Sequence, residues 1–332
     1  MMAILCTVVK GVDLPMFHPQ TDPELASLLA QMALEPIDWD DLPRQRRINN
    51  ARVLEQLQRG AAPVGVSIEN RQVPGTNNTP PVPLRIYRPA LGSGVLPGVY
   101  VIHGGGLVLG NLDSLELDCR RWTLEWNAVV VSVDYRLAPE TPYPGPVQDC
   151  FQGLHWMVDH ADELLIDSRR MAMYGTSAGG GLAAATALMV RDYGGPRLRL
   201  IMLNAPMLDD RNSSPSALNF ADAPIWTRSD NLLGWQAYLG ALWGSDVIVP
   251  YAVPGRAYNL QDLPPVFVTV GNIEVFRDEC VAFAERLMHD GTNVELHVWP
   301  GVFHGAEQFT QAAIVKRMEA ERNAAMIRAL YG

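Results

Sequence analysis

Cysteine is scarce in this chain, and its spacing excludes two common roles. The 332 residues include four cysteines, Cys6, Cys119, Cys150 and Cys280. None of them forms a Cys-x-x-Cys pair, so the sequence indicates neither a disulfide framework nor a cysteine zinc site. We therefore expect reduced thiols in a cytoplasmic protein.

Basic residues are also in the minority. The 26 Lys and Arg residues are outnumbered by 36 Asp and Glu residues, which gives a net charge of −10. Nucleic acids and anionic membrane surfaces are bound through basic patches. Neither is expected as a partner.

Apolar runs long enough to cross a membrane are missing. A spanning helix needs about 20 apolar residues, and no uninterrupted run in the chain approaches that length. The apolar start, Met1 to Val9, lacks a basic region and a small-residue cleavage site, so we expect no signal peptide. The 48% of hydrophobic residues are instead enough for a large globular core.

What the sequence does contain is an alternation of apolar strands and helices. Near-continuous apolar runs, typical of parallel strands buried on both faces, occur at 99–102, 128–133, 171–174, 198–203 and 265–270, before a final alternating strand at 294–299. Helical stretches lie at 114–126, 146–160, 178–193, 277–290 and 306–330. This rhythm predicts an α/β fold with a mostly parallel central sheet and helices on both faces.

Two segments fall outside this rhythm. Residues 1–60 are predicted to be helical, with Thr21 and Glu24 as a capping box at one helix start. Residues 209–260 form a long insertion around an aromatic helix, and they are too apolar for a disordered loop. We predict a main domain at 61–332, with residues 1–60 and the insertion 209–260 together forming a cap.

The most informative stretch is Gly175-Thr176-Ser177-Ala178-Gly179, between an apolar strand and a helix-forming run. A G-x-S-x-G turn in this context places the serine Oγ at the top of a sheet on a sharp, strained turn. The glycines let the strand and helix backbones approach closely. The helix N-terminus adds free N–H groups and a dipole that favours negative charge. We predict that Ser177 is a nucleophile.

An activated serine needs a base and a group that orients the base. His304 lies in a glycine-flanked loop after the last strand, at the edge where open α/β sheets hold their sites. Glu274 follows the preceding strand and gives the chain order Ser, acid, His. Asp278 is the fallback acid, although it and Glu279 also fit as charges at a helix N-terminus. We predict His304 as the base and Glu274 as the acid.

Backbone donors for an oxyanion are offered by His103-Gly104-Gly105-Gly106, directly after a buried strand. Consecutive glycines let N–H groups point into a cavity. Gly104 and Gly105 are predicted to donate, together with the N–H of Ala178. A phosphate-binding loop is disfavoured because neither G-x-G-x-x-G nor G-K-[ST] follows. His103 itself is interpreted as structural.

In this order, these blocks resemble the hormone-sensitive-lipase family of bacterial-type carboxylesterases, within the α/β-hydrolase superfamily. The resemblance rests on His-Gly-Gly-Gly at 103–106, Asp-Tyr-Arg-Leu-Ala-Pro-Glu at 134–140 and Gly-Thr-Ser-Ala-Gly-Gly at 175–180, and on the acid and histidine blocks. Thr176 points to the GTSAG subgroup. The resemblance covers residue 84 to the C-terminus. It implies an α/β-hydrolase fold with a catalytic domain and a helical cap, no metal, no organic cofactor and a possible homodimer.

Two departures from the family pattern affect the site. Glu274 stands where aspartate is usual, and the proline that usually follows is replaced by Val275. The longer side chain requires the loop to retract slightly to reach the histidine. Leu107 stands where an aromatic residue is common, which implies a reshaped acyl pocket.

The sequence therefore predicts a carboxylesterase that acts on small-molecule esters with short-to-medium acyl chains through a covalent acyl-enzyme. Hydrolysis of a thioester, amide or lactone stays open, because the same machinery serves all of them. A non-catalytic ligand-binding member of the fold is disfavoured, because all three triad positions are filled. Five aromatic residues could line the acyl pocket or form ordinary cap core, namely Phe17, Trp39, Trp226, Trp235 and Tyr238.

Overall fold

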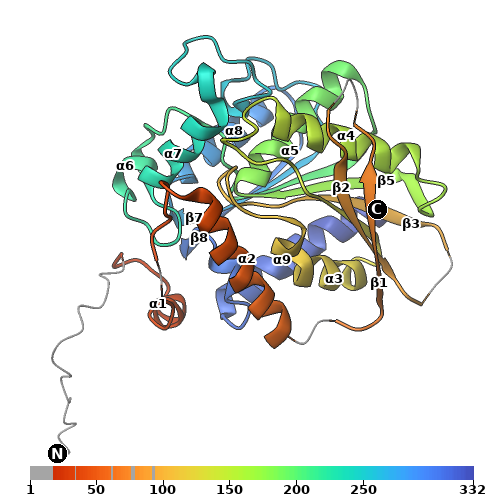
Figure 1. Ribbon diagram of the computed structural model, residues 1–332, viewed down its shortest axis with the longest axis horizontal. Coiled ribbons are helices and arrows are strands. Elements are labelled where there is room, and N and C mark those ends of the chain that lie inside the picture. The colour runs from red at the N-terminus through yellow and green to blue at the C-terminus, as the bar shows by residue number, and fades with distance from the viewer. Residues whose placement is uncertain (1–17, 34, 61–62, 76–78, 92–93) are drawn as a thin grey trace, which may run out of the picture.

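An eight-stranded sheet runs through the computed structural model, which describes residues 18–33, 35–60, 63–75, 79–91 and 94–332 (Figure 1). The strand order is β1-β2-β4-β3-β5-β6-β7-β8. Strands β1 and β2 pair antiparallel with each other, β2 pairs antiparallel with β4, and all later pairings are parallel. The strands are β1 (Val66–Val73), β2 (Val82–Pro89), β3 (Leu96–Ile102), β4 (Val129–Val133), β5 (Ile166–Thr176), β6 (Leu198–Asn204), β7 (Val266–Ile273) and β8 (Val294–Phe303). The predicted α/β fold with a mostly parallel sheet is confirmed.

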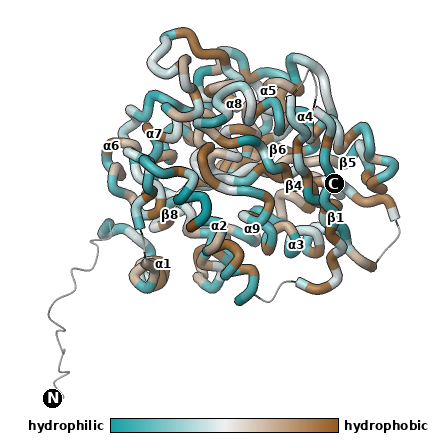
Figure 2. Tube along the Cα trace, viewed as in Figure 1, coloured by the Kyte–Doolittle hydropathy of each residue, from teal (hydrophilic) through white to brown (hydrophobic). Residues whose placement is uncertain are grey.

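The central strands are buried on both faces, as their apolar runs predict. Every residue of β4 is buried, and β3 and β6 each have a single residue that is not. The hydrophobic segments of these strands run through the middle of the molecule (Figure 2). A parallel sheet has this composition because helices must cover both of its faces.

Two layers of helices provide that cover (Figure 1). Helices α3 (Glu116–Glu125) and α9 (Ala313–Tyr331) pack on one face. Helices α4 (Gly145–Asp159), α5 (Ala178–Tyr193) and α8 (Arg277–His289) pack on the other. None of the helices in the described ranges combines the length and apolar character that crossing a membrane would need.

The remaining helices lie in the two segments predicted as the cap. They are α1 (Pro23–Leu29) and α2 (Leu42–Arg59) near the N-terminus, and α6 (Pro215–Asn219) and α7 (Arg228–Leu239) in the insertion. A hydrogen bond of 2.8 Å from Trp39 Nε1 to Asp230 Oδ1 joins the N-terminal segment to α7. Residues 1–17 of the predicted cap segment, with Cys6 and Phe17, lie outside the described residues.

Two local predictions were wrong. The N-cap of α1 is Asp22, whose carboxylate accepts hydrogen bonds from the N–H groups of Glu24 and Leu25, whereas Thr21 was expected there. Asp22 immediately precedes the helical Pro23, the residue that suits a first turn. The predicted helix at 306–330 is divided into the 3₁₀ turn η4 (Ala306–Gln308) and α9, which begins at Ala313.

Helix α5 approaches strand β3 closely enough to exclude a side chain at Gly179. A Cβ added there would lie 2.3 Å from the carbonyl oxygens of both Ile102 and His103. This glycine therefore sets the distance between the helix that follows Ser177 and the strand that precedes the predicted oxyanion loop.

Replacing Gly179 with alanine is expected to destabilise the fold by about 2 kcal/mol. Alanine favours a helix by about 1 kcal/mol over glycine, but overpacking typically costs about 1–3 kcal/mol, and the clash here is with backbone that cannot rotate away. Urea unfolding measures the change. Gly94→Ala is the matched control, because a Cβ at that position meets no atom within 4 Å. Equal stability of the two variants would contradict this packing argument.

Candidate active site

Ser177 occupies a strained turn between β5 and α5. Its φ of 54° and ψ of −124° lie in a region that non-glycine residues rarely adopt. Hydrogen bonds hold the turn in place: the Ser177 N–H donates to the Asn204 carbonyl at 2.8 Å, and the Met207 N–H donates to the Ser177 carbonyl at 3.0 Å. The end of β6 and the loop that follows it thus hold both the N–H and the carbonyl group of Ser177.

The imidazole of His304 lies between Ser177 and Glu274. Its Nε2 is 3.0 Å from Ser177 Oγ, and its Nδ1 is 3.2 Å from Glu274 Oε1. A histidine that donates from Nδ1 to the carboxylate leaves Nε2 free to accept the serine proton. All three side chains are buried, with Glu274 only 1% exposed.

The Glu274 carboxylate is also held by its own loop. Its second oxygen, Oε2, accepts a hydrogen bond of 3.2 Å from the N–H of Gly271, three residues earlier. A Cβ at Gly271 would lie 2.3 Å from the Val302 carbonyl oxygen and 3.2 Å from Glu274 Oε2. The glycine gives the glutamate room to fold back over the end of β7, which accommodates the extra methylene relative to aspartate.

The other two acids of this block contact different partners. Asp278 Oδ2 accepts a hydrogen bond of 2.7 Å from the Ser216 N–H, and Oδ1 pairs with Arg277 at 2.7 Å. Glu279 is buried and accepts a hydrogen bond of 2.7 Å from the Leu208 N–H. Burial raises the pKa of Glu279 well above its ordinary value. Neither acid is hydrogen-bonded to His304.

The predicted oxyanion donors meet at Ser177 from two directions. Ala178 is the first residue of α5, where N–H groups have no intrahelical acceptor. Gly104 lies against the serine, since a Cβ there would be 3.1 Å from Ser177 Cβ. Gly105 has a φ of 121°, and its Cβ would lie 2.2 Å from the Leu109 carbonyl oxygen. Within the described ranges, no acceptor is assigned to the N–H groups of Gly104, Gly105 and Ala178.

The His103 side chain holds the glycine loop at 103–106 in place from the interior of the protein. It is fully buried, stacks on Tyr135 with ring centroids 4.3 Å apart, and places Nδ1 2.8 Å from the Gly104 carbonyl. Burial lowers the pKa of His103 to about 4, so the ring stays neutral at pH 7. The Tyr135 hydroxyl donates to the His103 carbonyl at 2.9 Å.

A residue of the segment predicted as part of the cap contacts the chain just after the same loop. Arg46 of α2 donates from Nε to the Val108 carbonyl at 2.8 Å and from Nη2 to the Ala138 carbonyl at 2.7 Å. Its guanidinium also pairs with Glu140 at 2.7 Å. The Ala138 N–H in turn donates to the Leu107 carbonyl at 3.0 Å, so these bonds link α2, residues 138–140 and the oxyanion loop.

Opposing effects act on the pKa of His304. Burial alone would lower it, but the charge of Glu274, its hydrogen bond and the charge of Glu307 outweigh burial, so the pKa is raised above the ordinary 6.5. Phe276, with its ring centroid 5.1 Å from that of His304, is part of the apolar surroundings. In such surroundings a charge–charge interaction is stronger than in water.

The aromatic residues predicted near the pocket have different positions. Trp226 packs on Gly106, where a Cβ would lie 2.0 Å from the indole, and its ring centroid is 6.5 Å from that of His304. Trp235 and Tyr238 lie in the main hydrophobic core, and Trp39 packs at its edge. Trp226 is therefore the aromatic residue of this group that borders the site.

Sequence reasoning missed two polar residues close to Ser177 and His304. The Asn204 side-chain amide, at the end of β6, donates to Thr176 Oγ1 at 3.0 Å and to Glu307 Oε1 at 2.8 Å. It thereby connects the serine turn to the turn after His304. Asn204 directly follows the apolar strand predicted at 198–203, a position where a site residue could have been expected. Glu307 falls in a segment predicted as ordinary helix.

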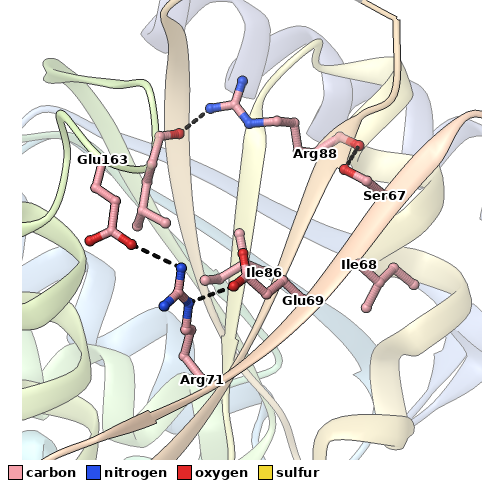
Figure 3. Close-up of a pocket in the computed structure, with 8 residues that line it drawn as sticks. Ser67, Ile68, Glu69, Arg71, Ile86, Arg88 and Glu163 are labelled. Carbon is pink, nitrogen blue, oxygen red and sulfur yellow. Dashed lines mark hydrogen bonds and ion pairs between the residues drawn. The ribbon is translucent and has the colours of Figure 1, made fainter.

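Among the clefts of the described surface are two that differ in their position relative to Ser177. One, of about 700 Å³, lies between α2, α3 and the turn η4 and is lined by Thr176 and Gly305, the chain neighbours of Ser177 and His304. The other, of about 400 Å³, lies between β1, β2 and the loop before β5, where Arg71 pairs with Glu69 at 2.7 Å and with Glu163 at 2.8 Å (Figure 3). These three side chains form ion pairs with one another at the edge of the sheet. Several strands separate this edge from β5, the strand that leads to Ser177. Across the described ranges, no three His, Cys, Asp or Glu side chains could together hold a metal ion.

Comparison with known proteins identifies extensive similarity. A family model described as the alpha/beta hydrolase fold matches residues 99–308. The chain is 39% identical over 272 residues to carboxylesterase NlhH of Mycobacterium tuberculosis, covering 80% of this chain and 83% of that protein. It is 38% identical over 227 residues to esterase LipI of the same organism, covering 68% and 71%.

Solved structures agree in both fold and extent. A bacterial heroin esterase superposes with a TM-score of 0.90 at 39% identity, covering 95% of this chain and 99% of that one. Esterase LipW from Mycobacterium marinum superposes with a TM-score of 0.85 at 34% identity, covering 94% and 97%. The similarity thus extends well beyond the matched motifs.

The geometry predicts that Glu274 and Asp278 differ sharply in their effect on catalysis. Glu274→Gln should lower kcat by about 10⁴-fold, because a neutral amide neither fixes the required tautomer nor stabilises the imidazolium. Asp278→Asn should lower it by less than about threefold, because its contacts are with Ser216 and Arg277. Steady-state kinetics on a p-nitrophenyl ester, with circular dichroism as a folding control, test the ranking. The reverse ranking would assign the acid to Asp278.

Proposed function

Since the chain belongs to the α/β-hydrolase family and is a carboxylesterase of the hormone-sensitive-lipase type, we propose that it cleaves esters through Ser177, His304 and Glu274 with a covalent acyl-enzyme. Short-to-medium acyl esters of small alcohols are the proposed substrates. The observation that carries the proposal is the chain of contacts from Ser177 Oγ through the imidazole to Glu274, at 3.0 and 3.2 Å.

In the acylation half, His304 Nε2 accepts the Ser177 proton while the serine oxygen attacks the ester carbonyl carbon. The carbonyl oxygen becomes an oxyanion and accepts hydrogen bonds from the N–H groups of Gly104, Gly105 and Ala178. A donor of this kind stabilises the transition state by about 3–4 kcal/mol. The imidazolium then protonates the alcohol oxygen, which leaves as the carbon–oxygen bond breaks.

In the deacylation half, water takes the place of the alcohol. His304 accepts a proton from the water, whose oxygen attacks the acyl carbon, and then returns a proton to Ser177 as the acid leaves. The Glu274 carboxylate holds the imidazole in the required tautomer and stabilises its charged form. Burial of the pair makes this stabilisation larger than it would be in water.

The cap is part of the proposal. We assign α1, α2 and residues 209–260 to it, and residues 61–332 apart from that insertion to the catalytic domain. The hydrogen bonds from Arg46 to the Val108 and Ala138 carbonyls support a role for the cap in holding the oxyanion loop. Thioesters, amides and lactones share the same attack step, and the geometry favours none of them over an ester.

Removal of the nucleophile tests the proposal directly. Wild-type protein should hydrolyse p-nitrophenyl acetate and butyrate faster than the palmitate, and Ser177→Ala should lower all rates by about 10⁶-fold, to the detection limit. The variant should unfold at the same urea concentration as wild type, because the substitution removes a single oxygen. Persistent ester hydrolysis by folded Ser177→Ala would exclude Ser177 as the nucleophile.

The raised pKa of His304 predicts how activity depends on pH. The imidazole must be neutral to accept the serine proton, and its neighbouring carboxylates hold its own proton to a higher pH than usual. Activity is therefore present above this pKa and is lost as pH falls through it. The profile of kcat/KM for an uncharged ester should rise with a midpoint above the ordinary 6.5. A midpoint at or below that value would contradict the electrostatic picture.

A further inference from the structure

The cleft of about 700 Å³ is lined by chain neighbours of two proposed reacting residues. Its wall includes Thr176, which directly precedes Ser177, and Gly305, which directly follows His304. Residues of α2, including Val53 and Leu57, form another part of the wall. A substrate held by Ser177 and His304 would therefore lie next to two residues, Thr176 and Gly305, that border this cleft.

Most of the charges that line the cleft are neutralised by neighbours. Asp113 pairs with Arg85 at 2.6 Å, and Asp118 pairs with Arg121 at 2.7 Å. Glu319 pairs with Arg121 and lies 3.6 Å from Arg322. Each of these acids has an arginine within ion-pair distance, so its field in the cleft is reduced.

Glu307 is the exception on this wall. Its Oε1 accepts a hydrogen bond of 2.8 Å from the Asn204 amide, and no Lys, Arg or His of the described chain lies within ion-pair distance of it. The carboxylate is partly exposed, three residues after His304 in the turn η4. The charge of Glu307 contributes to raising the pKa of both His304 and Tyr174. Among the described carboxylates that line the cleft, Glu307 is thus the one without an ion-pair partner, although the Arg322 guanidinium lines the same cleft.

The mechanism indicates which part of the ester lies nearest to the charge of Glu307. His304 must reach the alcohol oxygen to protonate it, so the alcohol leaves on the histidine side of the ester. Glu307 lies in the turn η4, which begins two residues after His304, and lines the adjoining cleft. Building on the proposed function, we propose that Glu307 sets the charge preference for the alcohol: esters whose alcohol carries an ammonium group are favoured over neutral esters of the same shape.

A pair of isosteric esters tests this preference. Acetylcholine and 3,3-dimethylbutyl acetate differ by a charged nitrogen in place of a neutral carbon in the alcohol. Glu307→Gln removes the charge and keeps an amide oxygen that can accept the Asn204 hydrogen bond. The ratio of kcat/KM for acetylcholine to that for dimethylbutyl acetate should fall about fivefold in this variant. In wild type the ratio should also fall as salt is raised, because salt screens the charge.

Matched controls separate Glu307 from general charge effects. Glu285→Gln makes the same change of charge on α8, on the other side of the sheet, where the Glu285 side chain is 67% exposed. This variant should leave the ratio of kcat/KM for the two esters unchanged. Asp118→Asn removes a negative charge within the cleft, from a carboxylate that is paired with Arg121. It should change the same ratio by less than about twofold. A shift with Asp118→Asn equal to that with Glu307→Gln would overturn the assignment to Glu307.

A second ester pair tests the assignment to the alcohol side. Betaine ethyl ester and ethyl 3,3-dimethylbutanoate place the same difference in the acyl part. Glu307→Gln should shift their ratio less than it shifts the acetylcholine pair, and an equal or larger shift would overturn the alcohol-side placement. An unchanged ratio for both pairs in an active variant would overturn the proposal as a whole, whereas failure of the triad would appear as activity in Ser177→Ala.

Discussion

The site depends on the strained strand-to-helix turn at Ser177. A φ of 54° at a serine costs free energy that the surroundings must supply. They supply it through hydrogen bonds from the Ser177 N–H to the Asn204 carbonyl and from the Met207 N–H to the Ser177 carbonyl. The glycine at 179 lets α5 lie directly on the end of β3. The same contact brings the N-terminus of α5 beside the glycines at 104–106, so one constraint places both the proposed nucleophile and the proposed oxyanion donors.

Burial gives the remaining polar groups their different properties. His103 and His304 are both buried, but only His304 has carboxylates beside it, so the pKa of His103 is lowered and that of His304 is raised. Glu274 is held by the Gly271 N–H and the imidazole, whereas Glu279 is held by a backbone N–H of the loop after β6. Histidine and glutamate thus each occur in two roles. One residue of each type supports a loop and the other belongs to the proposed triad, because different groups lie within about 3 Å of them.

Much of the fold could be predicted from the sequence, because buried parallel strands and glycine-marked turns have strong local signals. The central strands and most helices lie where the apolar runs indicated. The errors occurred at helix starts: Asp22 rather than Thr21 caps α1, and α9 begins at Ala313 after a separate turn. Both depend on backbone geometry, which residue spacing describes poorly. Glu307 was missed for the same reason, since as part of a continuous helix it would be an ordinary surface charge.

The sequence by itself determined which residue types stand at the carboxyl ends of the strands: a glycine loop at 103–106, Ser177 in its elbow, acids at 274–279 and His304. These are local properties, because glycines and short apolar runs impose the turns around them. Only the tertiary structure decided which of the acids reaches His304 and which of the described carboxylates in the cleft has no ion-pair partner. Glu274 and His304 are 30 residues apart along the chain, and Glu307 and Asn204 are 103 apart. Their interactions depend on distances of about 3 Å through space, which no spacing along the chain specifies.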